Sequence, residues 1–120
     1  MNKKKVPTMR LRGARDFKIV LTTAGSPSEA RRLASKAVRQ RQAACVNWIP
    51  KIHSTYWWKG KVTSAIECLL LFKTTRQQVP ELCRFIRKNH SYDLPELLVL
   101  SPDQGETAYL AWISDSLKTT

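Results

Sequence analysis

The side chains best suited to bind a metal ion in this sequence are a histidine and a cysteine that lie far apart along the chain. His90 directly follows a predicted helix, and neutral imidazole is a good ligand for copper and zinc. Cys45 opens a predicted strand after two alanines, where a thiolate would suit a soft ion such as Cu(I). Each residue also has a structural interpretation, because His90 could interact with the helix C-terminus and Cys45 could pack as a small hydrophobe. The sequence leaves both interpretations open for His90 and favours the packed thiol for Cys45.

The remaining cysteines and the second histidine carry no expected metal role. Cys68 and Cys83 lie in apolar runs, so we predict that they are structural. His53 lies in a predicted hairpin, and we expect it at the surface.

A second candidate site consists of polar residues beside apolar strands, namely Glu67, Lys73, Tyr92 and Glu96. Glu67 precedes four consecutive apolar residues, and a buried carboxylate there would need a partner such as Lys73 or Lys59. We expect these side chains to line clefts between subunits. The sequence favours structural ion pairs there over a pocket for a small ligand or an anion.

An aromatic cluster, Tyr56, Trp57 and Trp58, stands beside Lys59 and Lys61. Aromatic rings next to cations can stack bases and hold phosphates. The aromatic signature of RNA-recognition modules is nevertheless missing from both predicted central strands. Because Trp and Tyr are enriched in subunit interfaces, we predict that these three rings are interfacial.

The sequence shows no pattern typical of an enzyme. It contains no G-x-S-x-G, H-E-x-x-H or Walker motif and no visible pairing of a nucleophile with a base. We therefore expect a protein that is not an enzyme and requires no cofactor, with copper or another divalent metal as its candidate ligand.

The elements that position these residues follow from hydrophobic periodicity. Strands are predicted at 17–23, 43–56, 62–72 and 97–100. Helices are predicted after Ser26-Pro27-Ser28-Glu29, at about 78–88 and at 107–117. A turn is predicted at 101–105. The first helix has an apolar stripe of Ala30, Leu33, Ala34, Ala37 and Val38. The order β-α-β-β-α-β with a closing helix is that of an α+β, ferredoxin-like sandwich whose helices cover one face of a four-stranded antiparallel sheet.

The second and third predicted strands are unusually long. Strands commonly have about 5–6 residues, so the hairpin from 43 to 72 should project beyond so small a domain. Pro50 interrupts its first strand, which predicts a bulge or an edge position. Projecting strands need another chain to cover them, and we therefore expect an oligomer.

Charge is concentrated at the N-terminus. The chain has a net charge of +12, and residues 1–18 contribute +6 of it. We predict a disordered basic tail at 1–16 and a single domain at 17–120.

We expect no secretion signal and no membrane segment, and the odd number of cysteines suits a reduced, cytoplasmic protein. Nucleic-acid binding through the tail and the helix cations Arg31, Arg32, Lys36 and Arg39 is an alternative that the sequence does not favour.

Five segments in this order resemble the CutA family: Ala44-Cys45-Val46-Asn47, the stretch from Ser54 to Lys61, Lys73-Thr74, the stretch from His90 to Glu96, and Tyr109-Leu110-Ala111-Trp112. The resemblance covers residues 17–117. It implies a ferredoxin-like protomer, a homotrimer similar in architecture to the PII signalling proteins, and a role in divalent cation tolerance that includes copper binding.

The resemblance also implies a weakened metal site. Copper-binding bacterial relatives carry a cysteine on the first strand and paired histidines after the second helix. Thr22 and Asn89 stand at those positions here, and only His90 matches. We therefore expect weak or regulated metal binding. The alternative is a signalling or scaffold module that binds a small ligand or a partner protein in the intersubunit clefts.

Overall fold

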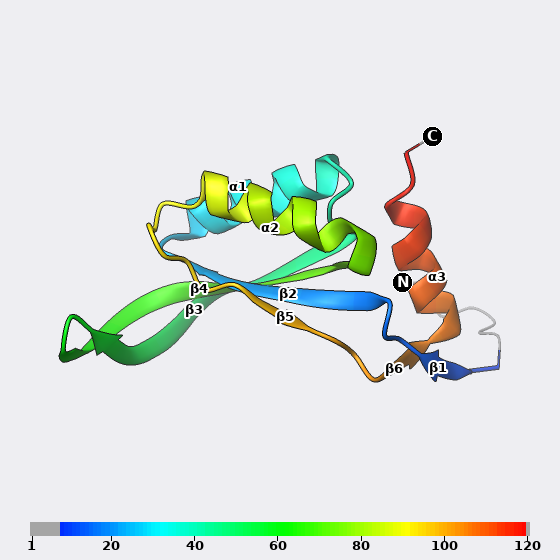
Figure 1. Ribbon diagram of the computed structural model, residues 1–120, viewed down its shortest axis with the longest axis horizontal. Helices are drawn as coiled ribbons and strands as arrows, with labels where there is room; N and C mark the ends of the chain where they lie inside the picture. The colour runs from blue at the N-terminus through cyan, green and yellow to red at the C-terminus, as the bar shows by residue number, and fades with distance from the viewer. Residues whose placement is uncertain (1–7, 120) are drawn as a thin grey trace.

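The computed structural model describes residues 8–119 of the chain. A four-stranded antiparallel sheet has the order β3-β4-β2-β5, and the two longer helices α1 and α2 lie together on one of its faces (Figure 1). The bounds are β2 Phe17–Ala24, α1 Pro27–Arg39, β3 Cys45–Trp58, β4 Lys61–Thr75, α2 Val79–Asn89 and β5 Leu98–Leu100. A 3-10 turn, η1 Arg76–Gln78, precedes α2. This arrangement confirms the predicted ferredoxin-like sandwich.

A smaller substructure stands at the opposite end from the hairpin. The strands β1 Leu11–Gly13 and β6 Gln104–Glu106 pair antiparallel, and α3 Thr107–Ser116 follows them (Figure 1). The prediction of disorder for residues 1–16 is therefore wrong for 11–13, and the predicted turn at 101–105 overlaps a strand. The first seven residues of the predicted tail lie outside the described residues.

The core follows from side-chain alternation in the strands and from the apolar stripe of α1. Val20, Leu70 and Phe72 point from the sheet toward Leu33 and Ile86 of the helices, and all five are fully buried. Ser26 caps α1, since its hydroxyl accepts the Glu29 N–H at 3.2 Å. The predicted stripe differs at Val38, which is exposed. A second cluster, Ala14, Phe17, Leu110, Ile113 and Leu117, holds α3 against the start of β2.

The β3–β4 hairpin extends well beyond the rest of the sheet. β2 pairs with β4 only from Cys68 to Thr75, so the segment 61–67 of β4 has β3 as its only neighbour in the sheet of the described chain. Seven residues at about 3.4 Å per residue correspond to a projection of about 24 Å. The register shift between Ile49 and Ile52 places a bulge at Pro50, as predicted. The radius of gyration is 16.0 Å, against about 14 Å for a compact chain of this length.

The sheet face opposite α1 and α2 is apolar, and no segment between residues 8 and 119 covers it. Ile19 pairs with Leu100, Leu21 with Leu98, and Ile49 with Leu69, and these residues are half-buried or exposed on the helix-free face. Leu71 lies between them on β4. An apolar surface of this kind marks a site of protein association.

Candidate functional site: an acidic and aromatic pocket at the base of the hairpin

A pocket of about 680 Å³ opens where the hairpin leaves the sheet. It is lined by Thr23 of β2, by Ser54, Thr55, Tyr56 and Trp58 of β3, by Glu67 of β4, and by Tyr92, Asp93, Leu94 and Glu96 of the segment before β5. This volume lies within the range of small-molecule sites, about 300–1,000 Å³. The pocket therefore combines three carboxylates, three aromatic rings and three hydroxyl groups.

Glu67 and Tyr92 form the centre of the pocket. The Tyr92 hydroxyl donates a hydrogen bond of 2.9 Å to Glu67 Oε2, and the Glu67 residue is only 8 % exposed. Burial, followed by the hydrogen bond to Glu67, raises the pKa of Tyr92 to about 12. Tyr92 therefore keeps its proton as a donor throughout the neutral range. The predicted partners Lys73 and Lys59 were wrong, because a tyrosine satisfies this carboxylate.

Gly25 makes room for that tyrosine. A Cβ atom at this position would lie 3.2 Å from the Tyr92 hydroxyl oxygen, a tight contact. The turn between β2 and α1 thus fixes how closely the Tyr92 ring approaches the sheet.

The segment before β5 is fastened to the sheet and to α1 by buried polar groups. The Thr22 hydroxyl, fully buried, donates to the Glu96 carbonyl at 2.6 Å. Glu29 accepts the Ser91 N–H and the Ser91 hydroxyl, each at 2.8 Å, and Gly25 N–H at 3.4 Å. These bonds position Tyr92, Asp93 and Glu96 beside the hairpin.

His90 belongs to the same network and has no free ring nitrogen. Its Nδ1 accepts the Tyr92 N–H at 3.0 Å, so the proton lies on Nε2, which donates to the Thr23 carbonyl at 2.6 Å. The His90 side chain is fully buried. A metal ion could bind this imidazole only after one of these bonds breaks.

The structure does not bring His90 and Cys45 together. His90 contacts Thr23, which pairs with Leu69, whereas Cys45 pairs with Lys73. Four residues along β4 separate these positions by about 13 Å. Among residues 8–119 no three or more His, Cys, Asp or Glu side chains are grouped so that they could hold a metal ion. These residues do not fit a chelated metal.

The other residues considered in the sequence do not line the pocket. Lys73 does not reach the pocket; its Nζ lies 6.0 Å from the centre of the Tyr109 ring. Asn89 donates to the Phe85 carbonyl at 2.9 Å. Trp57 is 74 % exposed and does not line the pocket. His53 is exposed, as predicted.

Cys68 and Cys83 are packed thiols, as predicted. Burial raises the pKa of both groups, which disfavours the thiolate that binds metals. The Cys68 thiol points toward the Pro50 carbonyl at 3.3 Å, so it lies against the bulge of β3.

The Glu29 network predicts loss of stability in acid. Burial raises the pKa of Glu29, but the hydrogen bonds from the Ser91 N–H and hydroxyl outweigh it and lower the pKa below the usual 4.5. Glu29 therefore contributes stability above the pKa of the unfolded chain, and this contribution is lost as the pH falls through the lower pKa of the folded protein.

We expect the melting temperature of Glu29→Gln to be lower than that of the wild type at pH 7, with a loss of about 1–3 kcal/mol in unfolding free energy. The difference should shrink between pH 5 and pH 3. Thermal unfolding across this pH range measures it, and the matched control is Glu106→Gln, outside the network. A difference in unfolding free energy between Glu29→Gln and the wild type that is the same at pH 7 and at pH 3 would contradict the prediction.

Comparisons with known proteins agree with one another. Residues 18–116 match the family described as CutA1 divalent ion tolerance protein. The chain is 38% identical over 99 residues to the divalent-cation tolerance protein CutA of Yersinia pestis (strain Pestoides F), covering 82% of this chain and 83% of that protein. It is 37% identical over 100 residues, 83% of its own length, to the chloroplastic protein CutA 1 of Oryza sativa subsp. japonica, and spans 56% of that longer protein.

Solved structures agree with the sequence matches. CutA from Synechococcus elongatus PCC7942 superposes with a TM-score of 0.87 at 38% identity, covering 91% of this chain and 96% of that one. The same protein complexed with a Bis-Tris molecule gives a TM-score of 0.83 at 36% identity, covering 89% of this chain and 99% of that one.

Proposed function

Because this chain belongs to the CutA1 divalent ion tolerance family, we propose that it acts in divalent-cation tolerance as a homotrimer that binds a small organic cation in the pocket beside Tyr92 and Glu67. The charge of that pocket is the observation that carries the proposal. Glu67, Asp93 and Glu96 line it, and no lysine or arginine is among its described lining residues, although Lys59 Nζ lies 5.9 Å from the centre of the Trp58 ring. In a chain of net charge +12, such a concentration of carboxylates favours a cationic ligand.

The aromatic rings support the same ligand class. Tyr56, Trp58 and Tyr92 line the pocket with the carboxylates, and aromatic faces attract ammonium groups, by about 0.5–2 kcal/mol. Thr23, Ser54 and Thr55 supply hydroxyl groups that suit a ligand bearing hydroxyls of its own. Bis-Tris, an amine with several hydroxyl groups, is such a molecule. Its complex with the Synechococcus protein supports its use as a probe here.

Trimerisation is supported by the exposed strands and by the apolar sheet face. The segment 61–67 of β4 offers a free edge, and the helix-free face carries Leu21, Leu71 and Leu98 without cover from the described chain. Three copies are the number that the family resemblance implies. In such a trimer Tyr56, Trp57 and Trp58 would lie at the subunit interface, and the pocket would open into the cleft between subunits.

A direct role in metal binding would rest on His90 or Cys45 alone. Since the ring nitrogens of His90 are both engaged and Cys45 lies elsewhere on the sheet, we expect copper to bind weakly. The role of this chain in cation tolerance would then depend on the small ligand rather than on direct metal binding. Three free thiols favour a reducing compartment such as the cytoplasm. None of the helices between residues 8 and 119 is long and apolar enough to cross a membrane.

The charge of the pocket predicts how binding responds to substitution. We expect the double variant Asp93→Asn, Glu96→Gln to bind Bis-Tris about tenfold more weakly than the wild type, because two charge interactions of roughly 0.5–1 kcal/mol each are removed. Titration calorimetry at a pH where the amine is protonated measures this. The affinity should also fall as the pH rises and the amine loses its proton.

The matched control is Asp103→Asn, Glu106→Gln, which removes the same charge near β6, away from the pocket. An equal loss of Bis-Tris affinity in the two double variants would count against the proposal. So would an affinity that does not change when the amine loses its proton. Saturable copper binding that disappears in His90→Ala would favour the metal site instead.

A further inference from the structure

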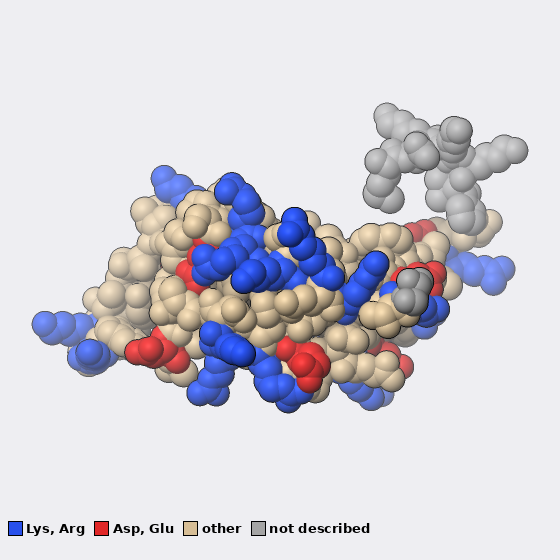
Figure 2. Space-filling model, turned by 90° about the horizontal axis from the view of Figure 1, so that it is seen from above, with Lys and Arg blue, Asp and Glu red and all other residues tan. Residues whose placement is uncertain are grey.

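The helical face of the molecule carries a concentration of positive charge. The exposed charged side chains of α1 and α2 are Arg31, Arg32, Lys36, Arg39, Arg84, Arg87 and Lys88, with Glu81 as the single acidic one. Figure 2 shows Lys and Arg side chains gathered over the helices on this face. Sequence alone indicates four of these cations on one helix, and the fold places three more from α2 beside them.

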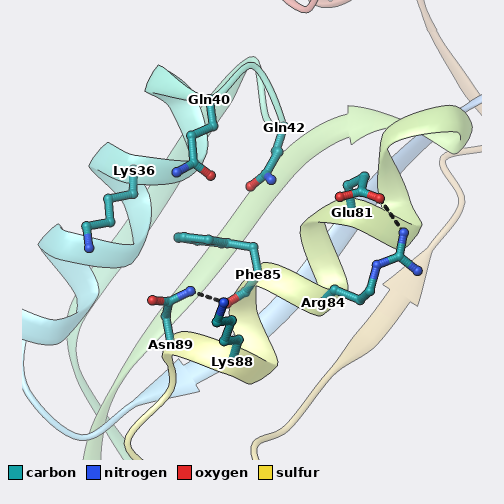
Figure 3. A pocket seen from close by; sticks show the side chains of 8 residues that line it. All are labelled: Lys36, Gln40, Gln42, Glu81, Arg84, Phe85, Lys88 and Asn89. Atoms are coloured by element: carbon teal, nitrogen blue, oxygen red, sulfur yellow. Dashed lines mark hydrogen bonds and ion pairs between the residues drawn. The ribbon is translucent and has the colours of Figure 1, made fainter.

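A furrow of about 420 Å³ runs between the two helices. Lys36 borders it from α1, and Arg84 and Lys88 border it from α2 (Figure 3). Arg84 forms an ion pair with Glu81, whereas neither Lys36 nor Lys88 has a carboxylate within ion-pair distance among the residues that the structure describes. Two unneutralised ammonium groups thus face one narrow groove.

Amide side chains add hydrogen-bonding capacity to the furrow. Gln40, Gln42 and Asn89 line it, and the amides of Gln40 and Gln42 lie near the Phe85 ring (Figure 3). Gln42 Oε1 is buried and is the one side-chain oxygen or nitrogen so buried, within residues 8–119, that lacks a hydrogen-bond partner. A buried acceptor without a donor is costly, and a rotation of the Gln42 side chain toward the furrow would let this oxygen accept an N–H or O–H group of a bound molecule.

We propose that this furrow binds a single strand of nucleic acid through its phosphate backbone. Lys36, Arg84 and Lys88 line the furrow, and the other four cations, all arginines whose planar guanidinium groups match phosphate oxygens in pairs, lie on α1 and α2 outside its lining. Arg84 and Lys88, which both line the furrow, are four residues apart on α2, which spaces their Cβ atoms by about 5–6 Å. Repeated cations at such intervals suit a chain of phosphates better than an isolated anion.

Two features distinguish a single strand from other polyanions. Packed helix axes lie about 8–10 Å apart, so a double helix could lay only its outer phosphates on the furrow, whereas a single strand could also bring its unpaired base edges to it. The amides of Gln40 and Gln42 can exchange hydrogen bonds with base edges, as asparagine and glutamine do in nucleic-acid complexes. The missing RNA-recognition signature concerns the central strands of the sheet and does not bear on this opposite face.

The test is fluorescence anisotropy of a labelled single-stranded RNA oligonucleotide with the full chain at several salt concentrations. Lys36→Gln, Lys88→Gln should weaken binding at least tenfold and reduce the slope of log K against log salt by about 1.4, since each lost phosphate contact removes about 0.7. The matched control is Lys51→Gln, Lys61→Gln on the hairpin, which changes the net charge equally and should alter affinity less than twofold.

Each of the following results would overturn the proposal: equal weakening by both double variants, equally tight binding of a polyglutamate peptide of the same length, or no binding of RNA at low salt. Tighter binding of a duplex than of the single strand would also contradict it. The furrow and the acidic pocket are separate sites, so failure here leaves the proposed organic-cation site untouched.

Discussion

Replacing Ile49 by aspartate is expected to convert the proposed trimer into monomers. Ile49 is 45 % exposed in the single chain and pairs with Leu69 on the helix-free face of the sheet, so the monomer should tolerate the change. In the proposed trimer the new carboxylate would be buried in an apolar interface, at a cost of about 3 kcal/mol or more per interface. That corresponds to a loss of about 100-fold or more in the affinity of each contact.

The matched control is Val38→Asp. Val38 is a β-branched residue of similar exposure, 39 %, on α1, and it lies on the opposite face of the molecule. Light scattering coupled to size-exclusion chromatography should show monomers for Ile49→Asp and an unchanged assembly for Val38→Asp. An intact trimer of Ile49→Asp would show that the helix-free face is not the interface.

Truncation of Phe72 is expected to cause the largest loss of folding stability. Phe72 is the largest fully buried side chain, and it packs between β2 and the helices. Phe72→Ala should lower the unfolding free energy by about 3–5 kcal/mol, because the lost burial adds to the cavity left behind.

Urea denaturation at a fixed protein concentration measures this loss, since the stability of an oligomer depends on concentration. Phe72→Leu preserves an apolar side chain and should cost less than about 1.5 kcal/mol. A loss below about 1 kcal/mol for Phe72→Ala would mean that the core closes around the gap, contrary to the packing described above.

The main elements could be predicted because their patterns are strong. The apolar stripe around Leu33 and the Ser26 cap defined α1, and the two long β segments on either side of Gly60 defined the hairpin. The strand β1 was missed because three residues carry no measurable periodicity. Its partner β6 lies more than ninety residues away in the sequence.

The candidate site could be predicted only in part. Glu67 and Lys73 share one face of β4, but six residues at about 3.3 Å each place them about 20 Å apart. Glu67, Tyr92 and Glu96 line one pocket of the single chain, and their place in a cleft between subunits stays a prediction, while Thr23 and Asp93 were not expected at this pocket. The path of the segment after α2 decides which side chain reaches Glu67, and that path depends on buried bonds from Thr22, Glu29 and His90.

The sequence contained polar residues that form such bonds, but their roles were ambiguous. Thr22 and Asn89 appear in the sequence as departures from a metal-binding pattern. In the structure they are ordinary hydrogen-bonding residues, one fastening the segment before β5 and the other bonding within α2. A polar residue in an apolar strand can indicate either a ligand site or a structural anchor, and only the position of its partner separates the two.

The mass of the assembly in solution tests the trimer most directly. Sedimentation equilibrium of the wild-type protein at micromolar concentration should give about 41 kDa, three times the 13.8 kDa of the chain. A mass equal to one chain would mean that the hairpin and the apolar sheet face remain in water, and a mass of two chains would exclude threefold symmetry. Either result would contradict the account.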